Sequence, residues 1–340
     1  MENEVLGGVP MSERQKEILK MIVQEYIHLA KPVSSKEICD ELGCSSATVR
    51  NDMAALEDLG YLEKTHTSSG RIPSEKGYRY YVDHLMEPKK ITGEDMLKLQ
   101  MIFHNQALEL SDCIKQSLMV ISEMTSYTSV VLGKASHENK LKEINVVPLN
   151  DNSLIVLVIT DQGHVEHKTI ELPNVSLEDV KKTVNLINDL IVGTPIDEVS
   201  GKLEFEIKPI ISRYVKEHEL LYNVFYRVFR EFQSKNVDVV GKDNILKQPD
   251  FNNVQKIREL FSKLNEEELE SKIVADKNDI SIYIGRETKI DSDVAVVQTS
   301  YKTAKEEGTI AIIGPKRMEY DRVVELLDYM KKHIEKETEE

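Results

Sequence analysis

The stretch "CSSATVRNDMAALEDLGYLEKTHTSSGR", residues 44–71, changes character twice along its length. It opens with small polar residues and continues with apolar residues at helical spacing, then alternates and becomes loop-forming after Gly60. Ser45 or Ser46 can cap the helix, and Gly60 can end it. The inward positions of this helix carry Val49, Met53, Leu56 and Leu59.

Two helices are expected before this segment. The first covers residues 12–30, with Ser12 as its cap and Lys31-Pro32 as its stop. The second is short, begins at Ser34 or Ser35 and ends at Gly43. A short glycine-containing turn between this helix and the next is typical of a helix-turn-helix. The strand-like "YLEKTH", the loop "TSSGRIP" and a further helix "SEKGYRYYVDHLM" extend the pattern to a winged helix-turn-helix.

A recognition helix enters the major groove of DNA with its first turns, which therefore need small or hydrogen-bonding side chains. Arginine can pair with guanine and asparagine with adenine, while wing residues contact phosphates or follow the minor groove. The same hydroxyl groups can act only as helix caps, and winged helices also bind proteins, so both alternatives stay open. The candidate DNA-binding residues are Ser45, Ser46, Thr48, Arg50, Asn51, Lys64, His66, Thr67, Ser68, Ser69, Gly70, Arg71, Lys76 and Arg79.

Charge and cysteine content limit the other function classes. The net charge of −15 argues against coating of nucleic acid by bulk charge, so DNA binding needs a local basic face. Three scattered cysteines predict reduced thiols and a cytoplasmic protein without a disulfide framework. No apolar run is long enough for a membrane span, and no signal peptide is expected. We find no catalytic motif and no cluster with metal-ligand spacing, so we expect no enzyme and no cofactor.

The remainder of the chain alternates between strands and helices. Residues 94–126 are expected to form one long amphipathic helix, and three strand-like runs follow it. A helical block comes next, then a small strand pair in "VDVVGKDNIL" and a helix over residues 252–270. Strands return before a final helix over residues 319–336. Strands on both sides of a helical block predict an α+β multidomain protein in which one domain is inserted into another.

Several motifs resemble the HrcA family of bacterial heat-inducible transcription repressors. They are "SERQKEILKMIVQEYI…KPVSSKEI", "SSATVRNDMAALEDLGYLEKTHTSSGRIPSEKGYRYYVD" and "IIGPKRMEY". The resemblance implies a dimer with a winged-helix domain, a GAF-like domain and an inserted, mostly helical dimerising domain. The expected boundaries are 1–11 for an N-terminal extension, 12–86 for the winged helix-turn-helix, 87–95 for a linker, 96–175 and 276–340 for the GAF-like domain, and 176–275 for the insertion.

The resemblance also implies a target and a partner. The target is double-stranded DNA with the CIRCE inverted repeat upstream of chaperone operons, and the partner is the GroEL chaperonin. In such repressors the chaperonin maintains the DNA-competent form, and heat-denatured proteins compete for it. The alternative is a winged-helix repressor that senses a small molecule through the GAF-like domain, although a purely structural role of that domain is favoured.

One helical stripe is the candidate dimer contact. Its residues recur on one face of the helix expected over residues 205–232, and the alternative is a stripe buried within the domain's own core. The stripe consists of Leu221, Val224, Phe225, Val228, Phe229 and Phe232.

Overall fold

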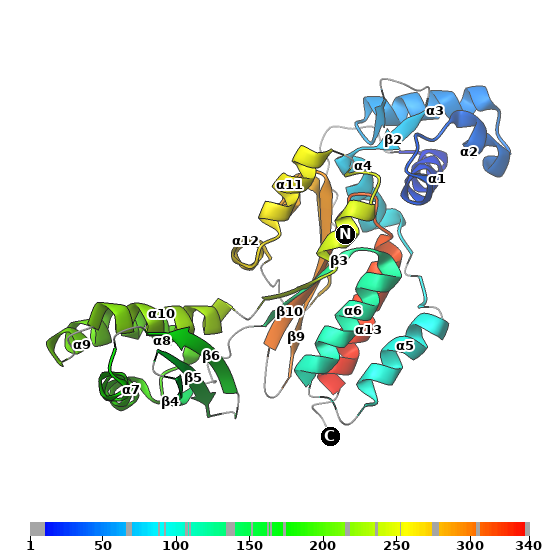
Figure 1. Cartoon of the computed structure of the whole chain (residues 1–340). Coiled ribbons are helices and arrows are strands. Elements are labelled where there is room, and N and C mark those ends of the chain that lie inside the picture. The colour runs from blue at the N-terminus through cyan, green and yellow to red at the C-terminus, as the bar shows by residue number, and fades with distance from the viewer. Residues whose placement is uncertain are drawn as a thin grey trace, which may run out of the picture. The chain divides into compact units, whose positions relative to one another are not determined.

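The chain forms two compact units, each with its own hydrophobic core (Figure 1). The first unit contains residues 1–131, 239–303 and 309–340, and the second contains residues 132–238 and 304–308. The computed structural model describes residues 11–65, 70–87, 89–91, 93–105, 108, 110–133, 140–150, 152–161, 163, 165–172, 175–214, 218–234, 237–251, 253–273, 279–303 and 307–336.

The first unit begins with the predicted winged helix-turn-helix. Serine side chains cap its helices, because Ser12, Ser34, Ser45 and Ser74 each accept a hydrogen bond from a backbone N–H in the first turn. Gly43 ends the second helix in the left-handed conformation at φ 62°. The elements are α1 (Glu13–Leu29), α2 (Ser35–Leu42), α3 (Ser46–Asp58), β1 (Leu62–Lys64), β2 (Arg71–Pro73), α4 (Glu75–Tyr80) and the π-helix η1 (Tyr81–Leu85).

The prediction of one helix over residues 94–126 is wrong. The structure has two helices, α5 (Gly93–Phe103) and α6 (Leu110–Thr125), and α6 packs against both α5 and α13 (Tyr320–Lys336). A turn follows α5, in which the N–H of Leu108 donates to the carbonyl oxygen of Asn105 at 3.0 Å. Folding back buries Leu99, Phe103 and Leu118, whereas one straight helix would leave much of this stripe in water.

The helix α13 packs against a five-stranded sheet. The strand order of this sheet is β7-β3-β10-β9-β8. Strands β8 and β9 pair in antiparallel orientation. Residues 128–133, not predicted as a strand, form one of its inner strands. The strands are β3 (Thr128–Gly133), β7 (Val237–Val240), β8 (Ser281–Ile284), β9 (Val294–Lys302) and β10 (Glu307–Pro315).

The predicted strand pair in residues 237–246 is also wrong. Strand β7 pairs with β3, and the residues after it form the 3-10 helix η3 (Lys242–Lys247). The side-chain amide of Asn244 donates to Ser122 Oγ at 2.9 Å and to the carbonyl oxygen of Tyr127 at 3.1 Å. These bonds attach η3 to the end of α6 instead of allowing a hairpin.

The predicted helix over residues 252–270 divides into α11 (Val254–Lys263) and α12 (Glu266–Lys272). The division falls at Asn265, whose side-chain oxygen accepts a hydrogen bond from the N–H of Glu268 and so starts a new helix. A short 3-10 helix, η4 (Gly285–Thr288), connects β8 to the segment before β9.

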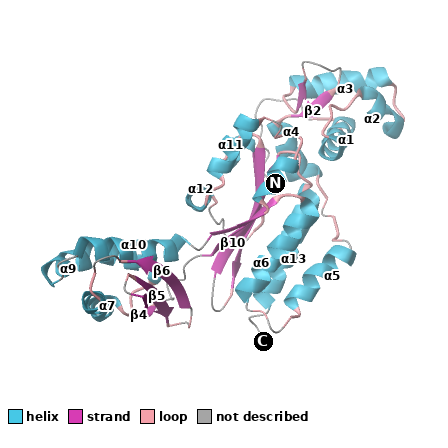
Figure 2. Ribbon diagram, viewed as in Figure 1, coloured by secondary structure: helices cyan, strands magenta, loops and turns pink. Residues whose placement is uncertain are grey.

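The second unit combines an antiparallel sheet of strand order β4-β5-β6 with a group of helices (Figure 2). Asn188 ties the sheet to α7, because its side chain bonds both the N–H and the carbonyl oxygen of Ile144 at 2.8 Å. The elements are β4 (Leu141–Asn150), β5 (Ser153–Thr160), β6 (Val165–Glu171), α7 (Leu177–Ile191), α8 (Ile196–Lys202), the π-helix η2 (Leu203–Ile207), α9 (Lys208–Tyr214) and α10 (His218–Ser234).

The compact units divide the chain differently from the expected domain boundaries. We expected the insertion to cover residues 176–275, but the second unit starts at 132 and already includes β4, β5 and β6. Residues 239–275 belong instead to the first unit. The reason is packing, because Ile144 and Val156 of this sheet share one core with Ile187 and Phe225 of the helices.

The predicted dimer contact is wrong for most of its residues. Leu221, Phe225, Val228 and Phe229 are buried in the core of the second unit of a single chain, and Val224 is partly buried against that core. The stripe on α10 is therefore an internal one. The side chain of Phe232 lies outside what the structure describes.

Candidate nucleic-acid interface

The first turns of α3 carry the predicted hydroxyl groups in capping positions. Ser45 Oγ accepts a hydrogen bond from the N–H of Thr48 at 3.2 Å and lies 2.9 Å from Thr48 Oγ1. Ser46 Oγ lies 3.1 Å from Ser35 Oγ, at the start of α2. These contacts define the start of the recognition helix and its junction with α2. Ser45 is also exposed, so its free lone pair can accept a further donor.

The exposed face of α3 carries the predicted base-reading residues. Ala47, Arg50, Asn51 and Ala54 are all exposed, and their spacing of three and four residues places them on one face of the helix. Arginine and asparagine are the side chains that pair with guanine and adenine in the major groove. The two alanines flank them with small surface, so the helix axis can approach the bases closely. Sequence reasoning did not identify Ala54 as part of this face, although its spacing from Ala47 contains that signal.

An ion pair holds α3 on α1. Asp52 is buried and accepts hydrogen bonds from Arg14 Nε at 2.7 Å and Arg14 Nη2 at 3.4 Å. The hydrogen bond and the charge of Asp52 raise the pKa of Arg14 above its usual value. Because Asp52 follows Asn51 directly, this pair fixes the rotation of the exposed face about the helix axis.

The wing is attached to the helices by its second strand. Strands β1 and β2 pair in antiparallel orientation, and Arg71 of β2 also bridges to Val33 through two backbone hydrogen bonds of 2.9 Å. Gly70 is buried, and a side chain there would lie 2.9 Å from atoms of Pro32. Glycine is therefore required here for internal packing. The predicted wing residues His66, Thr67, Ser68 and Ser69 lie outside the described residues.

Two of the predicted cationic residues near the wing bind other groups of the same chain, although Lys76 stays exposed. Arg71 Nε and Nη2 lie 2.7 and 2.6 Å from Glu57 Oε2 on α3. Lys76 donates to the carbonyl oxygen of Leu59 at 2.9 Å and lies over the ring of Tyr61. These contacts correct the expectation that Arg71 follows the minor groove, because its guanidinium joins the wing to the recognition helix. Lys64, by contrast, is exposed on β1.

Arg79 connects the winged helix to the five-stranded sheet within the first unit. Its guanidinium pairs with Asp83 at 3.3 Å and with Glu287 at 2.5 Å, and it donates to the carbonyl oxygen of Ile282 at 2.6 Å. Burial alone would lower the pKa of Arg79, but the hydrogen bond and charge of Glu287 raise it overall. The predicted DNA-binding residue Arg79 therefore makes a contact within the first unit.

Arg317 makes a second connection that sequence reasoning missed. The side chain is almost fully buried and donates to Asp250 Oδ2 at 2.8 Å, to Gln248 Oε1 at 3.1 Å and to the carbonyl oxygen of Ile27 at 3.0 Å. Ile27 lies in the last turn of α1. The motif "IIGPKRMEY" contained this arginine, but its partners are far away in the sequence.

Among the residues that the structure describes, no three histidine, cysteine, aspartate or glutamate side chains gather in a way that could hold a metal ion. None of the described helices is both long and apolar enough to cross a membrane.

The fold and the exposed face of α3 define a winged-helix protein of the DNA-binding class. Comparison with known proteins supports this description, since a family model described as "HTH domain" matches residues 14–79. The larger match is to the model described as "HrcA protein C terminal domain", which covers residues 111–324.

A curated relative extends the match to nearly the whole chain. The heat-inducible transcription repressor HrcA of Halalkalibacterium halodurans is 38% identical over 333 residues, which cover 96% of this chain and 97% of the relative. The chain therefore belongs to the HrcA family of heat-inducible transcription repressors. A solved crystal structure of a hypothetical protein shares the fold, with a TM-score of 0.64 at 24% identity over 96% of this chain and 98% of the other.

Proposed function

We propose that this protein represses chaperone operons by binding the CIRCE inverted repeat as a homodimer, with an activity that depends on the GroEL chaperonin and is lost on heat stress. The observation that carries the proposal is the exposed face of α3, with Arg50 and Asn51 between two alanines. A binding function of this kind requires no catalytic step. The proposal also agrees with the net charge of −15, because the recognition of DNA bases needs only a local surface of the protein.

The DNA-reading part of the proposal is tested by titration of the purified protein onto a CIRCE duplex and a scrambled duplex at several salt concentrations. Arg50→Ala should weaken binding to the CIRCE duplex by about 5- to 150-fold, since one bidentate base contact contributes roughly 1–3 kcal/mol. Binding to the scrambled duplex should change far less.

Arg258→Ala is the matched control for this titration. It removes the same charge from an exposed position on α11, in the first unit but outside the winged helix. We expect it to leave both affinities within twofold, because Arg258 lies outside the winged helix and salt weakens interactions between exposed charges. Equal losses on both duplexes in Arg50→Ala would make Arg50 a phosphate contact and remove the main support for base reading.

A dimer contact is needed to place two recognition helices on two half-sites. We propose the second face of the β4-β5-β6 sheet for it, in place of the buried stripe on α10. Ile155, Leu157 and Ile159 alternate along the central strand with buried residues and are themselves only partly buried. Val147 pairs with Ile155 and Val165 with Ile159, and these two valines are 44% and 55% exposed.

Such an apolar sheet face favours association with another copy of itself. Leu157→Asp should therefore produce monomers in analytical ultracentrifugation. Leu190→Asp, at an exposed position of α7, is the control and should leave the dimer intact. A folded Leu157→Asp variant that still sediments as a dimer would place the contact elsewhere.

The dependence on GroEL is supported by apolar surface in the first unit. Leu97 and Met101 lie one turn apart on α5 and are 61% and 76% exposed. A multidomain protein that loosens on heating exposes further apolar surface, which chaperonins bind. We expect GroEL to raise the CIRCE-binding fraction after mild heating, and an excess of a denatured competitor protein to cancel the effect. An unchanged active fraction would contradict this part of the proposal.

A further inference from the structure

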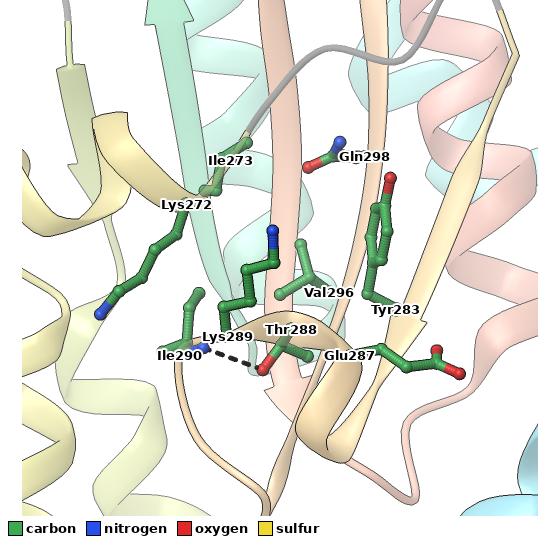
Figure 3. A pocket seen from close by; sticks show the side chains of 9 residues that line it. All are labelled: Lys272, Ile273, Tyr283, Glu287, Thr288, Lys289, Ile290, Val296 and Gln298. Atoms are coloured by element: carbon green, nitrogen blue, oxygen red, sulfur yellow. Dashed lines mark hydrogen bonds between the residues drawn. The ribbon is translucent and has the colours of Figure 1, made fainter.

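A small cavity lies in the first unit, next to the sheet edge formed by β8 (Figure 3). Its volume is about 80 Å³, and its walls come from the end of α12, from β8 and β9, and from η4 and the two residues after it. One water needs only about 10–15 Å³ of such space, so the cavity has room for a ligand of a few heavy atoms. Ile273, Ile290 and Val296 supply its apolar lining.

The polar groups of the cavity include a single unpaired cation. Lys289 and Tyr283 make no side-chain hydrogen bond or ion pair within the described part of the chain, and buried Gln298 adds an amide. The charge of Lys272, by contrast, is paired with Glu268. Figure 3 shows the ammonium group of Lys289 extending along the cavity beside Val296, toward Gln298.

Among the described residues of the lining there is one carboxylate, and it is already paired. Glu287 accepts hydrogen bonds from Arg79 at 2.5 Å and from the N–H of Ile284 at 3.1 Å. Figure 3 shows this carboxylate pointing away from Lys289 and Val296. Lys289 is exposed, and it is the lining cation that has no partner among the described residues, so it is available to pair with an anion that enters the cavity.

The backbone of Lys289 adds a second observation. Its φ of 57° lies in the left-handed region, which a residue with a side chain adopts at a cost and which glycine adopts freely. Thr288 Oγ1 holds this turn, because it donates to the carbonyl oxygen of Gly285 at 2.8 Å and accepts from the N–H of Ile290 at 3.1 Å. Strained positions of this kind cluster at ligand-binding sites.

We propose that this cavity binds a small monocarboxylate with a short apolar chain. The carboxylate pairs with the ammonium group of Lys289 and accepts from the hydroxyl of Tyr283, and the chain packs against Ile273, Ile290 and Val296. No covalent step is involved.

The cavity also lies on the segment that holds the winged helix. Glu287 of η4 binds Arg79 of α4, and a side chain on Gly285 would collide with Glu75, so η4 and α4 are in direct contact. A ligand that orders η4 therefore acts on the attachment of α4. This regulatory step rests on the proposed DNA binding, whereas ligand binding to the cavity does not.

Binding is measured on the full-length protein by fluorine NMR line broadening of 4,4,4-trifluorobutyrate, with 4,4,4-trifluorobutyramide as the neutral analogue at matched ionic strength. We expect the carboxylate to bind at least tenfold more tightly than the amide. Lys289→Met should remove this preference, since it keeps the length of the side chain but not its charge. Lys289→Gly should also lose the preference for the carboxylate, although glycine adopts the left-handed backbone freely. Loss of the preference in both variants would show that the charge of Lys289, and not backbone strain, is responsible.

Arg286→Gln is the control, because it removes a neighbouring exposed charge that does not line the cavity. It should keep the preference for the carboxylate. Equal broadening for the acid and the amide, or a preference that survives Lys289→Met, would overturn the site.

The regulatory step is measured as the CIRCE dissociation constant with and without the trifluorobutyrate probe. A shift of threefold or more in wild-type protein, absent in Lys289→Met, is expected. Probe binding with an unchanged dissociation constant would overturn the coupling through η4. No DNA binding under either condition would refute the proposed function and the regulatory step, while the NMR result on the site would stand.

Discussion

Arg50 and Arg71 carry the same charge, but their surroundings give them different roles. Arg50 is exposed on α3, whereas the Arg71 side chain is 13% exposed and bound to Glu57. The local sequence predicts that both are cationic side chains near a recognition helix. Only the position of Glu57 on α3, where it binds Arg71, distinguishes the proposed DNA-reading residue Arg50 from the structural residue Arg71.

Arg71→Ala should destabilise the winged helix. The change leaves the Glu57 carboxylate without its partner, and hydrogen bonds to charged groups contribute roughly 1.5–3 kcal/mol, so we expect a loss of about 1–3 kcal/mol. Chemical denaturation measures this, with Arg50→Ala expected to stay within about 0.5 kcal/mol of the wild type. Unchanged stability together with lost DNA binding in Arg71→Ala would show that Arg71 contacts DNA and is not a structural residue.

Tyr127 predicts a loss of stability at alkaline pH. Burial raises the pKa of Tyr127 to about 12, while its hydroxyl accepts a hydrogen bond from the N–H of Glu319 at 3.2 Å. Because the folded pKa exceeds the unfolded value of about 10, the contribution is complete below pH 10 and is lost as the pH rises toward 12. Between pH 9 and pH 11 the wild type should lose about 1 kcal/mol more than Tyr127→Phe in denaturant titrations. Parallel curves for the two proteins would contradict this assignment.

At the scale of elements, the ends of helices depend on what the next segment contacts. The run over residues 94–126 has a continuous apolar pattern, yet it breaks because α6 packs on α13 while α5 folds back. In the same way, the segment after β7 becomes η3 because Asn244 finds partners at the end of α6. Both outcomes depend on residues distant in sequence, which periodicity does not contain.

Gly241→Ala should be strongly destabilising, because Gly241 combines a φ of 71° with close neighbours. An added side chain would collide with Ser122 and lie 2.6 Å from Asn244 Nδ2. We expect a loss of about 3 kcal/mol, from the left-handed backbone and from overpacking together.

The matched control for Gly241→Ala is Gly43→Ala. Gly43 has a similar φ of 62° but nothing within 4 Å of the added atom, so only the backbone cost of about 1–2 kcal/mol applies. Thermal unfolding of both variants measures the difference. Equal losses of stability in the two variants would show that Ser122 and Asn244 move away from the added side chain without destabilising the protein.

At the scale of the whole molecule, the chain has two hydrophobic cores and not one. The first core joins the winged helix to the five-stranded sheet and its helices, and the second joins the β4-β5-β6 sheet to α7 and α10. Each unit is large enough to fold cooperatively. Two separable unfolding transitions are therefore expected in calorimetry.

Phe225→Ala should lower only one of these transitions. Phe225 is completely buried in the second core, and truncation of a buried phenylalanine costs about 3–5 kcal/mol. Leu56→Ala, in the core of the winged helix, should lower the other transition. A single transition that shifts equally in both variants would show that the units unfold together.

Much of the fold could be predicted from short-range patterns. Serine caps, glycine stops and apolar spacing identify α1, α2 and α3, the first wing strand and most strands of the two sheets, because each depends on neighbours within one or two turns. They do not identify β2, which was expected to be part of a loop, or β3. The same local chemistry identifies Arg50 and Asn51 as candidates for base reading, since the exposed face of a helix follows from its spacing. The family of the chain could be inferred for the same reason, from motifs concentrated in the winged helix.

Other features are decided only by tertiary packing. Which sheet belongs to which unit, the burial of the α10 stripe and the engagement of Arg71, Arg79 and Arg317 all depend on partners far away in the sequence. An amphipathic stripe has the same pattern whether it faces its own core or another subunit, and a cation has the same charge whether it is paired or free. The free energy that distinguishes these cases comes from burial and from specific partners, and both arise only when the chain has folded.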